Sequence, residues 1–293
     1  MIDSTREQVS KIQALITLLG DDNTSIRDVA RQHLFEFGQE AEEYLRQATF
    51  ADLEGKVRIE ARHVLEKIRR EDFVSSFYLL GLLDDQQFDL EHAVFLLARV
   101  GYPDLDSAPY RAELDELAHS VQRSTAGLDP VTEGREIVLR MSKVLHEQHG
   151  FSGNNEDYYD PDNSYLHRVL ERRTGIPVSL STLYLLIARR LNLVIRGVNL
   201  PIHFICQYVA GDDSFLFDPF HQGRLITRAE CMRILQGASQ KFEEHMLRPV
   251  RPRSILVRMI RNLVWIYYQR DEMEKVAMLD HLILLLRAKE SEL

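Results

Sequence analysis

The stretch from residue 163 to residue 220 constrains the fold more than any other part of the chain. It combines a helical segment, a Gly-Ile-Pro break, an apolar helix that opens on serines, and short strands that carry a histidine and an aspartate. A hydroxyl at a helix start, a histidine at one strand and an aspartate at the end of the next follow the order of a nucleophile, a base and an orienting acid. The candidate catalytic residues are therefore Ser179, His203 and Asp218.

These residues also have structural interpretations. A serine at a helix start is an N-cap, which contributes roughly 1 kcal/mol by satisfying a free N–H group. His203 at the mouth of a strand is equally well explained as a satisfied structural histidine. Cys206 lies three residues further along the same strand, so it points to the opposite face and is a poor partner for His203. The residues Gly211-Asp212-Asp213 predict the hairpin turn between this strand and the next.

The composition excludes several classes of function. The formal net charge is −9, and nucleic acids are bound through clustered Lys and Arg, so we expect no nucleic-acid partner. No apolar run approaches the roughly 20 residues of a spanning helix, and the first ten residues lack a signal pattern. We therefore expect a cytoplasmic protein with no membrane association. The cysteines Cys206 and Cys231 form neither a disulfide framework nor a zinc pattern.

A polar, acidic loop precedes the central stretch and raises the alternative of a calcium site. It contains Asp157, Asp160 and Asp162, but it lacks the glycine and the terminal glutamate that an EF-hand needs at fixed offsets. We therefore predict no metal and no cofactor. Arg172 and Arg173, just before the Gly-Ile-Pro break, could neutralise this loop across the turn, and solvated surface charge is the alternative.

The N-terminal part contains a short internal repeat. Ile26-Arg27-x-x-Ala30-Arg31-x-x-Leu34 recurs thirty-one residues later as Val57-Arg58-x-x-Ala61-Arg62-x-x-Leu65, which is typical of stacked amphipathic helices. This pattern resembles HEAT-type repeats, which implies a concave surface for a partner. We favour the other interpretation, an amphipathic helical cap on the next domain. Apolar spacing then predicts further helices over residues 88–100, 109–125 and 131–149.

The last forty residues predict an antiparallel helical hairpin, 254–269 and 272–287, after a proline-containing linker at 248–253. Asn262-Leu263-x-x-Ile266-Tyr267, followed by Ala277, resembles one tetratricopeptide hairpin. One copy cannot form a groove, so we expect this hairpin to pack onto the central domain, with a partner site as the alternative.

The stretch from residue 150 to residue 223 holds five motifs. They are Gly153-Asn154, Asn163-Ser164-x-Leu166, Leu170-Glu171-Arg172-Arg173-x-Gly175-Ile176-Pro177-Val178-Ser179-Leu180, Gly197-Val198-Asn199-Leu200-Pro201-x-His203-Phe204 and Asp218-Pro219-Phe220. With these motifs the chain resembles the transglutaminase-like superfamily, and more narrowly its SirB-type bacterial proteins. The resemblance implies a papain-like core in which a helix-start cysteine attacks an amide, a histidine takes its proton and an aspartate orients the histidine. His203 and Asp218 match the last two positions.

The chain departs from this family at the nucleophile, because no cysteine lies near the start of the central helix. Ser179 aligns best with that position, with Ser181 or Pro177 as the alternatives if the register is shifted. A helix terminus and an imidazolium can lower the pKa of a thiol from about 8.5 to neutral pH, whereas a hydroxyl needs a base in contact and an oxyanion hole. No Gly-x-Ser-x-Gly elbow surrounds Ser179.

We therefore expect an α+β, predominantly helical protein with a central helix on a small antiparallel sheet. The expected domains are a HEAT-like region at 1–72, a transglutaminase-like core at 73–247 and a tetratricopeptide-like hairpin at 248–293. The cleft is expected to be lined by Asn154, Asn163, Arg173, Pro177, Ser181, Pro201, Phe204 and Phe220.

Three functional hypotheses follow. The first is a non-catalytic, regulatory module that binds a protein or a peptide in the cleft. The second is an acyl-transfer enzyme, amidase-like or protease-like, that uses a Ser179-His203-Asp218 triad. The third is a structural scaffold with no ligand in the cleft.

Overall fold

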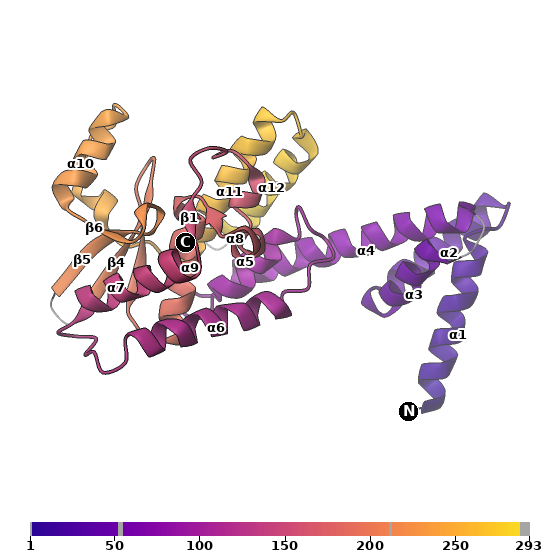
Figure 1. The fold of residues 1–293 in the computed structure, drawn as a ribbon. Coiled ribbons are helices and arrows are strands. Elements are labelled where there is room, and N and C mark those ends of the chain that lie inside the picture. The colour runs from indigo at the N-terminus through magenta and orange to yellow at the C-terminus, as the bar shows by residue number, and fades with distance from the viewer. Residues whose placement is uncertain (1, 52–54, 211–212, 288–293) are drawn as a thin grey trace. The chain divides into compact units, whose positions relative to one another are not determined.

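The computed structural model describes residues 2–51, 55–210 and 213–287, and the chain divides into two compact units, Met1–Ser76 and Phe77–Leu293. In the described part of the first unit the helices are α1 (Ile2–Leu18), α2 (Thr24–Phe37), α3 (Gln39–Phe50) and α4 (Gly55–Leu82), the last of which continues beyond residue 76 (Figure 1). Asn23 caps α2, and Gly38, at φ +55°, turns the chain into α3. The core of this unit includes five residues of the repeated motif, Ala30, Leu34, Val57, Ala61 and Leu65.

The second unit begins with helices that match the predicted apolar periods. They are α5 (Leu90–Ala98), α6 (Ala108–Ser124) and α7 (Gly134–Lys143), and a π-helical turn, η1 (Val144–Gln148), follows α7 directly. The helix predicted from residue 131 begins three residues later. The reason is that the carboxylate of Asp129 accepts hydrogen bonds from the backbone N–H groups of Val131 and Thr132, which holds those residues in a turn.

This unit contains a four-stranded antiparallel sheet in the order β3 (Ile195–Asn199), β4 (Phe204–Ala210), β5 (Asp213–Asp218) and β6 (Arg224–Ile226). Helix α9 (Pro177–Arg190) packs against it, and the rings of Tyr184 and Phe217 are 5.6 Å apart. The predicted central helix on a small antiparallel sheet is therefore present. Gly211 and Asp212, in the predicted turn, lie outside the described residues.

Short elements connect α7 to α9 and position the start of α9. Strand β1 (Ser152–Gly153) pairs in parallel with β2 (Thr174–Gly175), the residues just before α9. The loop between them contains a 3-10 turn, η2 (Pro161–Asn163), and the short helix α8 (Leu166–Arg172). A second 3-10 turn, η3 (Pro219–His221), follows β5 directly.

The C-terminal part holds α10 (Arg228–Gly237), the 3-10 turn η4 (Glu244–Leu247), and the helices α11 (Pro252–Gln269) and α12 (Met273–Arg287). The last two form the predicted helical hairpin (Figure 1). Residues 248–253, predicted as a linker, are instead partly attached to the sheet. The N–H group of Val250 donates to the carbonyl of Gly197 at 2.8 Å, because strand β3 is an edge strand with free backbone groups.

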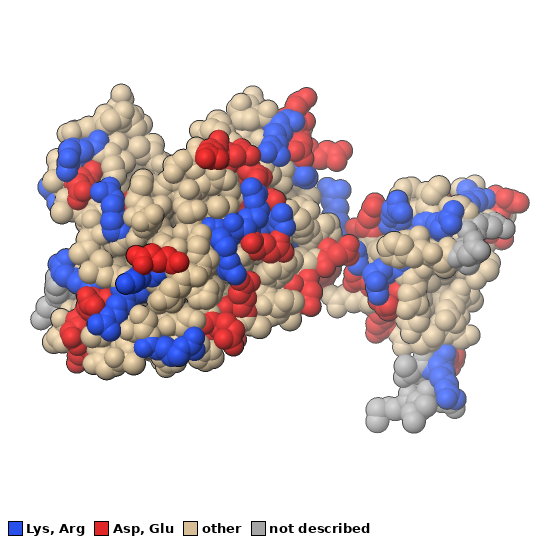
Figure 2. Space-filling view, in the orientation of Figure 1, with Lys and Arg blue, Asp and Glu red and all other residues tan. Residues whose placement is uncertain are grey.

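Acidic and basic side chains are interspersed on the face of the second unit that Figure 2 shows. The ion pairs of this unit include Arg190 with Glu91 at 2.7 Å and Arg173 with Glu113 at 2.5 Å. Among the described residues, none of the helices combines the length and the apolar character needed to cross a membrane.

Candidate functional site

His203 and Asp218 meet at the end of the sheet. His203 immediately precedes β4, and Asp218 is the last residue of β5, the strand that pairs with β4. Nε2 of His203 lies 2.8 Å from Oδ2 of Asp218, and both side chains are buried. Because Nε2 donates to the carboxylate, the neutral ring carries its lone pair on Nδ1. Within the described residues, Nδ1 of His203 has no hydrogen-bond partner.

The carboxylate of Asp218 is fully buried and accepts four hydrogen bonds. Oδ1 accepts from the backbone N–H groups of Phe220 and His221, and Oδ2 accepts from the rings of His203 and His221. Burial raises the pKa of Asp218, but the hydrogen bonds and positive charge of the two histidines outweigh burial and lower this pKa below its ordinary value. Asp218 is therefore an anionic anchor for both rings.

His221 is a member of the site that the sequence analysis missed. Its Nδ1 lies 2.7 Å from Oδ2 of Asp218, and its ring centroid is 5.8 Å from that of His203. The only sequence signal was its position, three residues after Asp218, where the turn η3 folds back on its own cap. About half of the His221 side chain is exposed, so it forms the solvent-facing side of the cluster.

These three residues are also the group that could hold a metal ion, since one ligand atom of each lies within 4.8 Å of the others. A tetrahedral zinc ion at about 2.0–2.1 Å from each ligand needs ligand atoms roughly 3.3 Å apart. The two N–O distances of 2.8 and 2.7 Å are instead hydrogen-bond distances. The arrangement seen here is therefore that of a hydrogen-bonded cluster.

Ser179 does not join this cluster. Its side chain is fully buried in the first turn of α9, where Oγ accepts from the N–H group of Ile176 at 3.0 Å and lies 2.6 Å from the carbonyl oxygen of Asn163. Its hydroxyl proton is directed to a backbone carbonyl, and no hydrogen bond joins Ser179 to His203 in the described residues. The structure thus brings together two members of the predicted triad and directs the third into its own helix start.

The alternative nucleophile positions are also buried. Ser181 has no exposed surface, and its Oγ is 3.5 Å from the carbonyl oxygen of Phe204. Pro177, the first residue of α9, carries no nucleophilic group. Cys206 packs beneath α9 with Sγ near the carbonyl of Ser181, and burial raises the pKa of its thiol. A buried, protonated thiol is a poor nucleophile.

Two of the predicted cleft residues hold the acidic loop against α9. Asn163 is fully buried, and its amide donates to the carbonyls of Asp157 and Tyr158 while accepting from Asn154 at 3.1 Å. Because the hydroxyl of Ser179 donates a hydrogen bond to the backbone carbonyl of Asn163, Asn163 also connects the loop to the start of α9. Sequence reasoning did not identify this function of the Asn163 backbone.

The remaining predicted cleft residues fall into different environments. Phe220 stacks edge-on over His203 at 6.1 Å, and Pro201 is exposed two residues before His203. Phe204 is buried in the sheet. Arg173 contacts Glu113 of α6 and lies 4.8 Å over the ring of Phe151. Arg173 is therefore engaged by α6, away from the acidic loop.

The loop is neutralised by the other member of the arginine pair. The guanidinium of Arg172 lies 2.5 Å from the carboxylate of Asp160 and 3.4 Å from that of Asp162. Of the two predicted contacts to the loop, the structure therefore contains the one from Arg172.

A buried polar chain behind the site was not predicted. The hydroxyl of Tyr184 lies 2.9 Å from Nε2 of His146 and 3.0 Å from Oγ of Ser142, and Nδ1 of His146 lies 2.6 Å from the carbonyl oxygen of Phe151. Burial lowers the pKa of His146, so the ring is neutral and Nδ1–H donates to Phe151. Nε2 then accepts from Tyr184, which fixes the direction of the chain. The π-helical turn η1 places His146 there.

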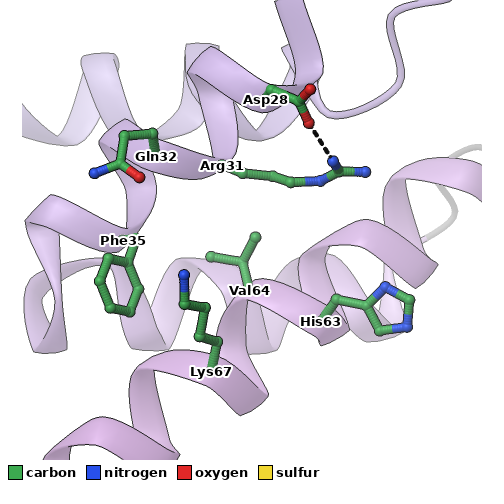
Figure 3. A pocket seen from close by; sticks show the side chains of 7 residues that line it. All are labelled: Asp28, Arg31, Gln32, Phe35, His63, Val64 and Lys67. Carbon is green, nitrogen blue, oxygen red and sulfur yellow. Dashed lines mark hydrogen bonds and ion pairs between the residues drawn. The ribbon is translucent and has the colours of Figure 1, made fainter. Parts of the chain in front are cut away.

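The first unit contains a separate pocket of about 170 Å³ between α2 and α4 (Figure 3). Arg31 pairs with Asp28 at 2.5 Å and with Glu60 at 2.6 Å, and the ammonium group of Lys67 lies 4.3 Å over the ring of Phe35. These charged groups engage one another within the unit. The candidate site for chemistry is therefore the His203 and Asp218 cluster of the second unit.

Comparisons with known proteins give a family and several relatives. The family model described as the transglutaminase-like superfamily matches residues 108–261. A UPF0162 protein of Xylella fastidiosa is 33% identical over 205 residues, which cover 68% of this chain and 72% of that protein. The UPF0162 protein PA3419 of Pseudomonas aeruginosa is 32% identical over 177 residues, 59% of this chain and 63% of that protein.

A eukaryotic protein is also similar to the chain. F-box only protein 21 of Homo sapiens is 28% identical over 231 residues, which cover 70% of this chain and 36% of that protein. No solved structure matches the chain. The family model spans more than half of the chain and includes α9, His203 and Asp218. The chain therefore belongs to the transglutaminase-like superfamily, with bacterial UPF0162 proteins among its homologues.

Proposed function

We propose that this chain is a non-catalytic transglutaminase-like module that binds a protein or an extended peptide around His203. The observation that supports this proposal is the environment of Ser179, whose oxygen is fully buried and already bonded to the backbone of Ile176 and Asn163. A nucleophile has to present its oxygen to a base and to a substrate at once. Ser179 could do so only if the start of α9 and the loop before α8 separated.

The surface beside His203 has the groups that an extended peptide would need. Nδ1 of His203 can accept a backbone N–H bond, and the neighbouring Ile202 exposes 43% of its surface. The ring of Phe220 adds an apolar wall. A hydrogen-bond acceptor between apolar side chains fits a peptide backbone with an apolar residue beside it.

The flanking helices support an interaction role in this proposal. We propose the domain limits 1–72, 73–247 and 248–293, with α1 to α4 as a HEAT-like pair of helical hairpins and α11 with α12 as a tetratricopeptide-like hairpin. In this proposal the chain is a SirB-type protein and the module is regulatory. The flanking helices would supply additional binding surface and no catalytic group.

The acyl-transfer alternative has one observation in its favour. Asp218 orients His203 through Nε2 and leaves Nδ1 free, which is the arrangement expected of a general base held by an acid. An enzyme of this kind, amidase-like or protease-like, would use Ser179 after a rearrangement of the helix start.

Peptide display tests the binding proposal. Peptides selected on the wild-type protein should lose affinity for Ile202→Asp, because a carboxylate beside His203 disrupts the apolar contact. Val194→Asp is the matched control, because Val194 is similarly exposed, at 47%. It lies directly before the first residue of β3, whereas Ile202 lies beyond the last residue of that strand. Enriched peptides that bind wild type and Ile202→Asp equally well, or a failure to enrich any peptide, would contradict the proposal.

A further inference from the structure

Four arginine side chains line one pocket at the start of the C-terminal hairpin. The pocket has a volume of about 250 Å³, and its lining includes Arg253, Arg258 and Arg261 from α11 and Arg287 from the end of α12. Among the residues that the structure describes, no acidic side chain lines it, although the chain as a whole has a net charge of −9. Four like charges around a small volume raise the electrostatic energy of the folded protein unless an anion offsets them.

The carboxylates of the described residues do not neutralise this cluster. Arg253 donates to the carbonyls of Leu80, Gly81, Leu83 and Leu286, which are neutral acceptors. The side chains of Arg261 and Arg287 have no ion-pair partner within residues 2–51, 55–210 and 213–287. Elsewhere in this unit the arginines commonly pair with acids, as Arg168, Arg172 and Arg190 do.

The guanidinium of Arg258 lies in an unfavourable environment. One of its terminal nitrogens donates to the carbonyl of Pro201 at 3.1 Å, but its Nε–H is buried and has no partner among the described residues. Burial, with the positive charge of Arg261, lowers the pKa of Arg258 despite the opposing effect of Tyr158. A buried N–H donor without an acceptor is costly, so an acceptor bound beside it would stabilise the folded protein.

Two neutral groups complete the lining. Oδ1 of Asn199 is buried without a hydrogen-bond partner in the described part of the chain, and rotation of the amide would present its NH2 group to the same space. Ser254 lies in the first turn of α11, a helix whose N-cap makes no side-chain hydrogen bond. The positive end of the helix dipole therefore adds to the field of the arginines.

We propose that this pocket binds a small phosphate-type dianion. A tetrahedral dianion accepts several hydrogen bonds at once and so matches donors that converge from α11, α12 and Asn199. The volume of about 250 Å³ is below the usual range for drug-sized ligands and suits a single oxyanion or a phosphomonoester head group. This site is separate from the His203 cluster, and it does not depend on the proposed peptide-binding function.

Calorimetric titration with inorganic phosphate tests the proposal. The wild-type protein should bind one phosphate per chain, and affinity should fall as sodium chloride is raised. Arg261→Gln and Arg287→Gln should each weaken binding by about tenfold or more, because each removes a charge-assisted hydrogen bond. Both residues are exposed, so both variants should keep the wild-type circular dichroism spectrum and melting curve.

The matched control is Arg233→Gln, which removes an exposed arginine of α10 that does not line the pocket. This variant should bind phosphate as the wild type does. Sulfate should compete with phosphate, and acetate at the same ionic strength should not. The proposal is wrong if millimolar phosphate gives no binding heat with the wild type, if Arg233→Gln weakens binding as much as the pocket variants do, or if acetate binds as well as phosphate.

Discussion

Nε2 of His203 lies 2.8 Å from Oδ2 of Asp218, inside a protein whose serine at the start of the central helix forms no bond to that histidine. His203 directly precedes β4 and Asp218 ends the neighbouring strand β5, so the pairing of these strands sets their distance. The residues predicted to act as acid and base are thus held together, while the residue predicted to act as the nucleophile is bonded to the backbone of Ile176 and Asn163.

The variant Asp218→Asn should lower the free energy of unfolding by roughly 2 kcal/mol at pH 7, because both histidines lose an anionic partner. The folded pKa of Asp218 is lowered from 3.8, so its contribution is present above that pH and is lost as pH falls through the lower folded value. Urea unfolding of both proteins should therefore show a difference that narrows below pH 3.8.

The control for this experiment is Asp280→Asn, which changes an exposed aspartate of α12. Its stability should stay within about 0.5 kcal/mol of the wild type at every pH. A loss at Asp218 no larger than the loss at Asp280 would show that the buried carboxylate contributes nothing to the fold.

His167 is the most deeply buried histidine of the second unit and has no hydrogen-bond partner on either nitrogen among the described residues. The rings of Tyr102 and Tyr110 lie 4.4 and 5.5 Å from it. Burial lowers its pKa from 6.5 to about 4. At pH 5 the ring of His167 is therefore neutral in the folded protein, whereas the same ring is protonated in the unfolded chain.

Stability should consequently fall as pH drops from 6.5 towards 4, with a slope of up to about 1.4 kcal/mol per pH unit from His167. His167→Phe keeps an aromatic ring in the same site and removes the titrating group. This variant should gain on the wild type at pH 5 relative to pH 7.5 in urea unfolding. His119→Phe, at an exposed position of α6, should leave the slope unchanged; equal slopes for His167→Phe and wild type would refute the assignment.

Gly223 directly precedes β6 and lies against the buried polar chain of Ser142 and Tyr184. Its φ is +68°, and a Cβ atom there would lie 1.8 Å from Oγ of Ser142 and 2.9 Å from the hydroxyl of Tyr184. Gly223→Ala should therefore cost roughly 3 kcal/mol in thermal or urea unfolding, from the left-handed backbone and the clash together.

Gly127→Ala separates these two contributions. Gly127 also has a positive φ, +83°, but no atom lies within 4 Å of a Cβ placed there, so only the backbone cost of about 1 kcal/mol should remain. Similar losses for both variants would mean that the chain around Ser142 relaxes freely.

The sequence predicts the helix-on-sheet core well because the relevant signals are local. The Gly-Ile-Pro break places the start of α9, and Asp218-Pro219 ends β5, so His203 and Asp218 are brought to neighbouring strand ends. The orientation of Ser179 is a different matter. It depends on the carbonyl of Asn163, sixteen residues earlier, which only the folded loop brings to the helix start.

Two further features have no local signal. The π-helical turn η1 rotates His146 towards Tyr184, although helical periodicity predicts one continuous helix to residue 149. The residues that line the arginine pocket are spread along the sequence from Asn199 to Arg287. The overall net charge of −9 therefore does not indicate that a positively charged pocket exists. Composition reports the total charge, whereas a binding site depends on where the charges lie.

The variant Ser179→Cys tests whether the helix start and His203 still form an environment that lowers a thiol pKa. In the observed geometry the side chain at this position is buried and turned away from His203, so the cysteine should react slowly with iodoacetamide below pH 8. Mass spectrometry of the alkylated protein gives the rate, with Ser214→Cys, exposed in β5, as the reactive control. Faster alkylation at 179 than at 214 below pH 8 would indicate a retained catalytic environment.

Labelling with a fluorophosphonate probe, followed by peptide mass spectrometry, tests the central claim most directly, because the probe reacts only with an activated serine. Wild type and Ser179→Ala are compared under native conditions. We predict no adduct on the peptide that contains Ser179 in the wild type, and the same background in the variant. An adduct on Ser179 that disappears in Ser179→Ala would contradict the non-catalytic assignment and establish the acyl-transfer alternative.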